Sequence, residues 1–149
     1  MRGTFTTTTY DSRDAFTRQL SSGIHVCHNE FTNVGFEWIW HRLVGVANDT
    51  LSQASIWVGD SAQPFNPGDV SLWGEQTANA GLDSGFPEVV GAKVTLRATF
   101  GERDAIFDWA ERAVVTASGV LLDRAVGDQG RKVLGAVWVV EAELELGIA

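Results

Sequence analysis

Two segments near the end of the chain place an apolar residue at every second position. In residues 93–100 and 138–146, every even-numbered position is apolar. Successive side chains of a strand point to opposite faces, so each segment is predicted to be a strand with one buried face. The other face carries Lys93 and Arg97 in the first segment and three glutamates in the second. Because like charges on one strand face repel, we predict antiparallel neighbours with Arg97 opposite Glu141. The same register pairs Lys93 with Glu145 and Phe100 with Trp138.

Residues Asn33 to Gly45 show a different pattern, in which apolar residues recur with the period of a helix. Five apolar residues share one helical stripe: Phe36, Ile39, Trp40, Leu43 and Val44. Their spacing predicts an amphipathic helix over residues 33–45, capped by Thr32 or Asn33 and ended by Gly45. A strand through the same residues is the competing interpretation, but Ile39 breaks its alternation. An aromatic stripe of this kind is expected to pack against the core.

The rest of the body is predicted to consist of short strands, turns and loops. Prolines and glycines mark residues 60–69, which include Phe65, and residues 77–87 as two surface loops. Strands are predicted at 53–59, where the strand is buried, at 113–117, at 119–126 and from 133 onward. Helical turns are predicted at 70–76, capped by Asp69, and within 102–112, and a hairpin turn is predicted at 127–130. The predicted fold class is α+β but mainly β, an antiparallel β-sandwich or barrel-like domain over residues 23–149.

Residues 1–22 differ in composition from this domain. They hold three arginines and two aspartates, whereas the remainder holds 8 basic and 17 acidic residues. Residues 12–20 have the pattern of a short helix capped by Ser12. The segment is interpreted either as a frayed end or as an extended arm that buries its aromatic side chains on a neighbouring subunit. The candidate partner-binding residues are Arg2, Phe5, Tyr10, Phe16 and Leu20 on the arm, with Phe65 on the first loop.

Four side chains of metal-binding type lie close together in the sequence: His25, Cys27, His28 and Glu30. A zinc site usually draws ligand pairs from separated segments, and His41 is the other histidine of the chain. A short strand with a buried Cys27 is therefore the favoured interpretation, and no metal ligand is assigned.

Composition narrows the classes of function. A chain of 149 residues with 44% hydrophobic content is long enough for one domain with a real core. A net charge of -8 argues against nucleic acid or an anionic membrane as the partner. No apolar run approaches the roughly 20 residues that cross a bilayer, and the first residues lack the apolar core of a signal peptide, so a cytoplasmic setting is expected. The single cysteine excludes an intrachain disulfide.

Catalytic motifs do not emerge from the sequence. It contains no Walker-type phosphate loop, no Gly-x-Gly-x-x-Gly and no Gly-x-Ser-x-Gly. An acidic cluster at Glu102, Asp104, Asp108 and Glu111 could hold a cation or a proton, but a solvated turn is the favoured interpretation. Neither an enzyme nor a cofactor is predicted, and an assembly component fits the pattern better.

A series of short motifs leads to a family resemblance. The series consists of residues 29–39 (Asn-Glu-Phe-Thr-Asn-Val-Gly-Phe-Glu-Trp-Ile), 56–61 (Ile-Trp-Val-Gly-Asp-Ser), 69–75, 94–100, 110–112, 119–124 and Lys132. In this order, over about residues 28–146, it resembles small β-rich virion proteins of tailed bacteriophages, a group that includes capsid decoration proteins and tail or fibre components.

The resemblance implies a structural role in the virion, without a cofactor, an active site or a small-molecule substrate. Together with the N-terminal arm it favours a capsid decoration protein, assembled in the host cytoplasm and bound as a homotrimer to the major capsid protein. The alternative is a tail-associated, fibre or baseplate protein. A third interpretation is a small-ligand-binding β-domain that uses its tryptophan-rich core as a pocket.

Overall fold

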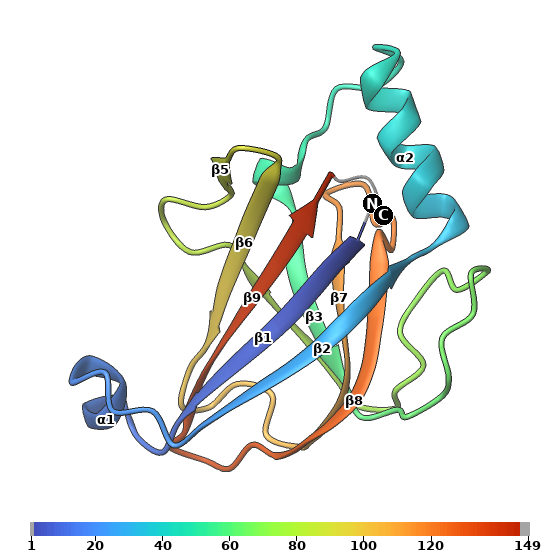
Figure 1. Cartoon of the computed structure of the whole chain (residues 1–149). Coiled ribbons are helices and arrows are strands. Elements are labelled where there is room, and N and C mark those ends of the chain that lie inside the picture. The colour runs from blue at the N-terminus through green and yellow to red at the C-terminus, as the bar shows by residue number, and fades with distance from the viewer. Residues whose placement is uncertain (1, 147–149) are drawn as a thin grey trace.

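Within residues 2–146, nine strands form one antiparallel sheet that curls around a shared core as a half-barrel (Figure 1). The computed structural model describes residues 2–146. The strand order is β4-β3-β7-β8-β2-β1-β9-β6-β5, and the curl brings β4 close to β6. The mainly β class is thus confirmed, in its barrel-like form. The strands are β1 (Arg2–Tyr10), β2 (Gly23–Phe31), β3 (Ser55–Gly59), β4 (Thr77–Gly81), β5 (Glu88–Val90), β6 (Lys93–Phe100), β7 (Asp108–Val115), β8 (Asp123–Arg131) and β9 (Val137–Glu145).

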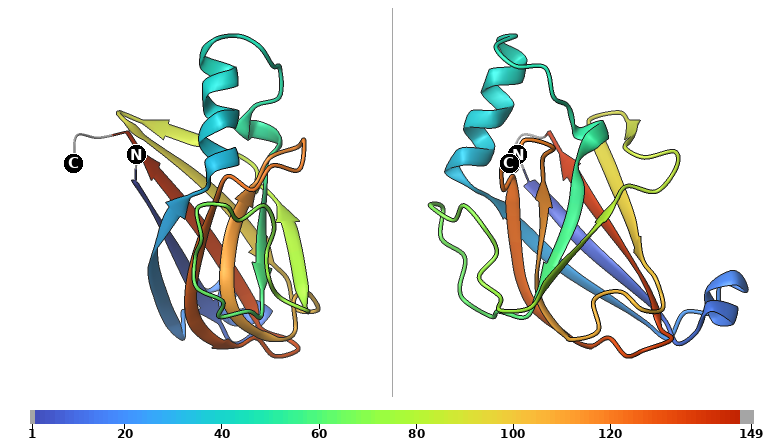
Figure 2. Two further views of the ribbon diagram at one scale, coloured as in Figure 1. Left: turned by 90° about the vertical axis from the view of Figure 1, so that its right-hand side faces the viewer. Right: turned by 180° about the vertical axis from the view of Figure 1, so that it is seen from behind.

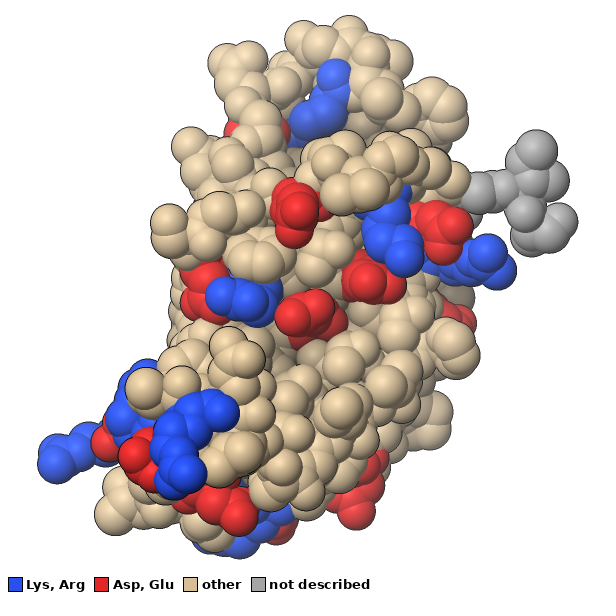
Figure 3. Space-filling view, turned by 60° about the vertical axis from the view of Figure 1, so that its left-hand side comes forward, with Lys and Arg blue, Asp and Glu red and all other residues tan. Residues whose placement is uncertain are grey.

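The predicted pairing of the two alternating segments is confirmed. β6 and β9 are antiparallel neighbours, with Arg97 opposite Glu141. Lys93 lies opposite Glu145 and Phe100 opposite Trp138, as the charge pattern predicts. Basic and acidic side chains are interspersed on the outer face of this region (Figure 3). The alternation therefore determined both the buried face and the register of these two strands.

The prediction of an N-terminal arm is wrong for residues 2–10. These residues form β1, which pairs along its length with β2 on one side and β9 on the other. Phe5 and Thr7 have no exposed surface. The sequence concealed this strand because two of its core-facing residues are threonines, and Thr7 is accommodated there by donating a 2.7 Å hydrogen bond to Gln129. Residues 2–10 therefore belong to the same sheet as the predicted domain and are not separated from it by a boundary.

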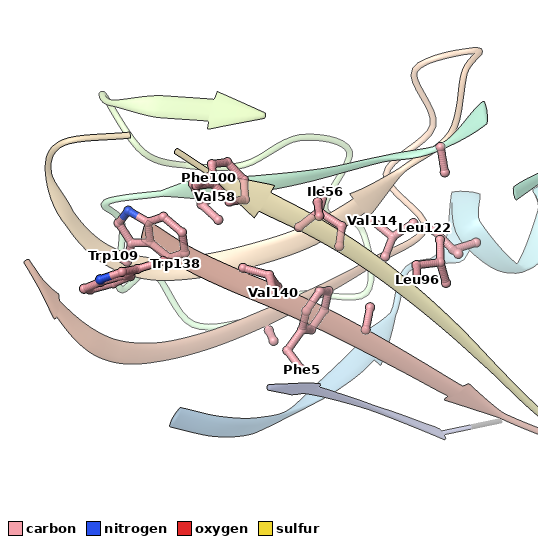
Figure 4. Close-up of a cluster of buried hydrophobic side chains, with 14 of the residues drawn as sticks. Phe5, Ile56, Val58, Leu96, Phe100, Trp109, Val114, Leu122, Trp138 and Val140 are labelled. Carbon is pink, nitrogen blue, oxygen red and sulfur yellow. The ribbon is translucent and has the colours of Figure 1, made fainter. Parts of the chain in front are cut away.

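Aromatic and aliphatic side chains together fill the interior of the curled sheet (Figure 4). Trp109 is fully buried and lies edge-on to two neighbours, with ring centroids 5.0 Å from Phe100 and 4.8 Å from Trp138. Its indole N–H donates to the Ala105 carbonyl at 3.0 Å. These rings pack on one another as core side chains do.

In the described part of the chain, two α-helices complete the fold. Helix α1 (Arg13–Thr17) follows β1 and is capped by Ser12, and α2 (Asn33–Leu43) follows β2 and stands at one end of the sheet (Figures 1 and 2). The helix predicted at 33–45 is confirmed, as is its Thr32 cap, which accepts from the Gly35 N–H at 2.9 Å. Gly45 follows the helix with a φ of 77°, a conformation that favours glycine.

Several local predictions are corrected by the pairing of strands. Residues 70–76 form no helix, and residues 77–81, predicted as loop, form β4. The turn predicted at 127–130 lies inside β8, because β7 pairs with β8 as far as Arg131. The helical turn predicted within 102–112 gives way to β7 from Asp108 onward. A bulge between Trp109 and Glu111 adds an extra residue to β7, so the side chains after it point to the opposite face from the one that strict alternation would give. The sequence pattern that marks a strand is therefore lost.

Candidate docking surface

The six residues predicted to bind a partner do not share one surface. Phe5 lies inside the core, and Phe16 packs edge-on against Tyr10 with ring centroids 5.3 Å apart. Arg2 lies at the other end of β1, 3.8 Å from Glu145. Leu20 is 54% exposed after α1, and Phe65 is half-buried in the loop between β3 and β4. A single contact area built from these side chains is therefore not formed within one copy.

The candidate metal ligands are divided between the two faces of β2. His25 and Cys27 are half-buried, while His28 and Glu30 are exposed. The acidic cluster is dispersed as well: Glu102 pairs with Arg13, Asp108 with Arg131 and Glu111 with Arg124. Within residues 2–146, no three His, Cys, Asp or Glu side chains are grouped so that they could hold a metal ion.

Glu111 is the centre of a buried ion network that holds the loop between β3 and β4 against the sheet. Its carboxylate accepts a 2.7 Å hydrogen bond from Arg124 Nε and two further bonds, at 3.2 and 2.7 Å, from the backbone N–H groups of Trp73 and Gly74. Arg124 also donates to Asp69 at 3.3 Å. The three charged side chains are almost completely buried. The Glu111 carboxylate is satisfied by Arg124 and by two backbone N–H groups of the loop, so the network fastens the loop to the sheet.

A second polar group lies inside the half-barrel, where β2 meets β8. Asp123 accepts hydrogen bonds from the Val114 N–H at 2.8 Å and from the Asn29 amide. Burial raises the pKa of Asp123 to about 7. Also buried, the Arg112 guanidinium donates to Thr7 and Cys27, and burial lowers the pKa of Arg112. These contacts link β1, β2, β7 and β8 through side chains.

The apolar stripe predicted on α2 is present, but most of it does not pack against the core. Ile39 is its half-buried member, and the Phe36 ring lies 5.5 Å from that of the core residue Phe31. Four of its residues are exposed: Phe36 by 43%, Trp40 by 63%, Leu43 by 72% and Val44 by 65%. The helix instead buries Gly35 and Trp38. A side chain at position 35 would meet the Leu122 carbonyl oxygen, 2.1 Å from an added Cβ, so glycine allows the close approach. The prediction of core packing was wrong because the buried face lies beside the stripe.

An apolar groove of about 510 Å³ runs beside this stripe. Its walls come from α2, from a 3-10 turn at Leu51–Gln53, from the turn between β5 and β6 and from the end of β9. The apolar lining consists mainly of Trp38, Ile39, Leu43, Leu51, Val89, Val94, Leu122, Leu144 and Leu146. Val89 and Leu146 are 72% and 64% exposed. The four stripe residues together with this groove are referred to below as the α2 surface.

Charged side chains at the groove are compensated within the same copy. Arg42 pairs with Asp49 and lies over the Trp38 ring, 4.1 Å from its centroid. Lys93 lies 3.4 Å from Glu143, and Glu145 lies 3.8 Å from Arg2. The α2 surface is therefore apolar and close to neutral, in contrast to the acidic chain as a whole.

Sequence reasoning identified the stripe but missed the groove, since its walls are more than 100 residues apart in the chain. Fold and surface together define a class: a mainly β, antiparallel half-barrel with an exposed apolar surface at one end. Comparison with protein-family models, with curated proteins and with solved structures finds no match to this chain. None of the helices within residues 2–146 is long and apolar enough to cross a membrane.

Proposed function

We propose that this protein is a structural subunit of a larger protein assembly, of the kind formed by the virion proteins of tailed bacteriophages. The observation that supports the proposal best is the α2 surface. Large apolar side chains gathered around a groove are costly in water, and on a soluble domain they usually mark a contact with another macromolecule. A subunit that is covered in its final assembly avoids that cost.

The rigidity of the scaffold fits the same role. The interior is filled with aromatic rings, and the longest loop is fastened to the sheet by a buried ion network centred on Glu111. A rigid body that presents a preformed surface loses little conformational entropy when it docks. Repeated copies of such a subunit can therefore assemble with the same geometry at each position.

The position within the particle is open to two proposals. The sequence favoured a capsid decoration protein on the major capsid protein for two reasons: the chain is one compact domain, and residues 1–22 resembled an arm that crosses a neighbouring subunit. With residues 2–10 inside its own sheet, the second reason for preferring the head to the tail no longer holds. The proposal covers a capsid decoration protein at the virion surface and, as the second candidate, a tail-associated protein.

Counting copies of the chain in purified particles tests the proposal. Phage particles are isolated from the lysate that contains the chain, washed at high salt, and analysed by quantitative mass spectrometry against a known shell protein. A capsid decoration protein is expected in hundreds of copies per particle, and a tail protein in a handful to a few dozen. If the chain is abundant in the lysate and missing from the particles, the proposal is wrong.

A further inference from the structure

We propose that the α2 surface docks onto the same surface of a second copy, so that two chains form a twofold dimer. In this dimer the stripe of each α2 enters the groove of the other copy. The inference builds on the proposed function, because it names the partner of the surface that carries it. Three observations support the inference: the relative position of the stripe and the groove, the charge of the α2 surface and the area of the α2 surface.

Stripe and groove lie side by side on one end of the molecule. Leu43 belongs to both, as an exposed stripe residue and as part of the groove wall. Trp40 and Val44 continue the stripe on the side away from the groove, since they lie three residues before and one residue after Leu43 on the helix. The stripe is the projecting part and the groove is the recess. Because they are adjacent, a twofold rotation about an axis near Leu43 places the stripe of each copy in the groove of the other. A ring of three would need them on different sides of the molecule.

The charge of the surface suits a like partner. A chain with a net charge of -8 repels its own copies unless the contact region is locally neutral. Arg42, Lys93 and Glu145, the charged residues that line the groove, each have a partner of opposite charge in the same copy. The groove lining therefore presents no uncompensated charge that would repel an identical surface, and Glu37, next to the stripe on α2, lies 3.8 Å from His41.

The size of the surface approaches what a stable interface needs. Six exposed apolar residues contribute: Phe36, Trp40, Leu43, Val44, Val89 and Leu146. A large apolar side chain presents on the order of 100 Å² to solvent, which gives roughly 600 Å² before the half-buried groove walls are added. Standard interfaces bury about 800 Å² on each partner. The α2 surface thus comes near the required area without any other part of the molecule.

Substitution of Leu43 provides the first test. Leu43→Glu and Leu134→Glu form a matched pair, because both leucines are 72% exposed and Leu134 lies outside the α2 surface. Molar mass is measured by light scattering during gel filtration, over a range of concentrations, and circular dichroism verifies the fold. The wild type and Leu134→Glu are expected to be dimers with dissociation constants within threefold of each other, and Leu43→Glu is expected to weaken the dimer at least 100-fold.

A disulfide trap tests the symmetry. A residue near a twofold axis meets its own counterpart, so Leu43→Cys in a Cys27→Ser background should form a disulfide-linked dimer when oxidised glutathione is added. Leu134→Cys in the same background is the control and should stay unlinked. A linked dimer at position 43 alone supports the inference. Equal linking at both positions, or none at position 43, overturns it.

The inference is also overturned if the wild type is monomeric throughout or trimeric, or if both glutamate variants weaken the dimer equally. Its failure can be told apart from failure of the proposed function. A monomer in solution that is counted in particles removes the dimer and leaves the structural role. A dimer that never enters particles removes the structural role and leaves the dimer.

Discussion

Phe5→Ala tests whether the first strand belongs to the core. Phe5 has no exposed surface and lies in β1 between Cys27 of β2 and Ala142 of β9. Truncating a buried phenylalanine to alanine costs about 3–5 kcal/mol. The variant also loses a cation–π contact, since the Arg112 guanidinium lies 5.6 Å from the ring centroid. Against a typical free energy of unfolding of about 5–15 kcal/mol, this is a large fraction.

Urea denaturation measures the effect. With a slope of about 2 kcal/mol per molar urea, the loss should lower the unfolding midpoint by about 1.5–2.5 M. Leu20→Ala is the control, because Leu20 is 54% exposed and its truncation should change the free energy of unfolding by no more than about 0.5 kcal/mol. If the two midpoints shift equally, β1 contributes nothing to the core, and residues 1–22 would have to be interpreted as an arm after all.

Two further predictions concern the buried polar groups. Glu111→Ala leaves Arg124 buried with Asp69 as its one remaining carboxylate partner and should cost about 3–5 kcal/mol in urea denaturation; a cost below about 1 kcal/mol would contradict the role assigned to the network. For Asp123, burial raises the pKa from 3.8 to about 7, so the folded state holds a proton that the unfolded state releases between these values. Stability should therefore fall as pH rises from about 4 to 7, by on the order of 4 kcal/mol above pH 7, and Asp123→Asn should remove this dependence. Parallel stability profiles of the wild type and Asp123→Asn over pH 4–8 would show that Asp123 does not titrate in this window.

The elements that could be predicted are those in which one face is apolar and the other is polar or charged. β6 and β9 have one apolar and one charged face, and the charges of one strand complement those of the other, so both their register and their direction could be inferred. Helix α2 was predictable from its 3.6-residue period and from local caps at Thr32 and Gly45. In each case the information lies in the residue pattern of the elements themselves and of their caps.

The elements that were missed depend on contacts from far along the chain. The core-facing threonines of β1 look like surface residues until Gln129, 122 residues away from Thr7, provides a hydrogen-bond partner. The strand pattern of β7 is interrupted by a bulge, and Glu111 looks like a solvated acid until Arg124 and the loop backbone surround it. Buried polar groups are stable only with partners, and the partners are a property of the fold.

By itself, the sequence determined which segments of this protein have an apolar face, that the domain is mainly β and that α2 carries an aromatic stripe. The tertiary structure decided what each face meets. Close approach of Gly35 to the Leu122 carbonyl turns α2 so that Trp38 is buried and the stripe remains exposed. Periodicity records that apolar residues share a side of a helix, but whether that side is covered depends on the surfaces that the curled sheet brings to it.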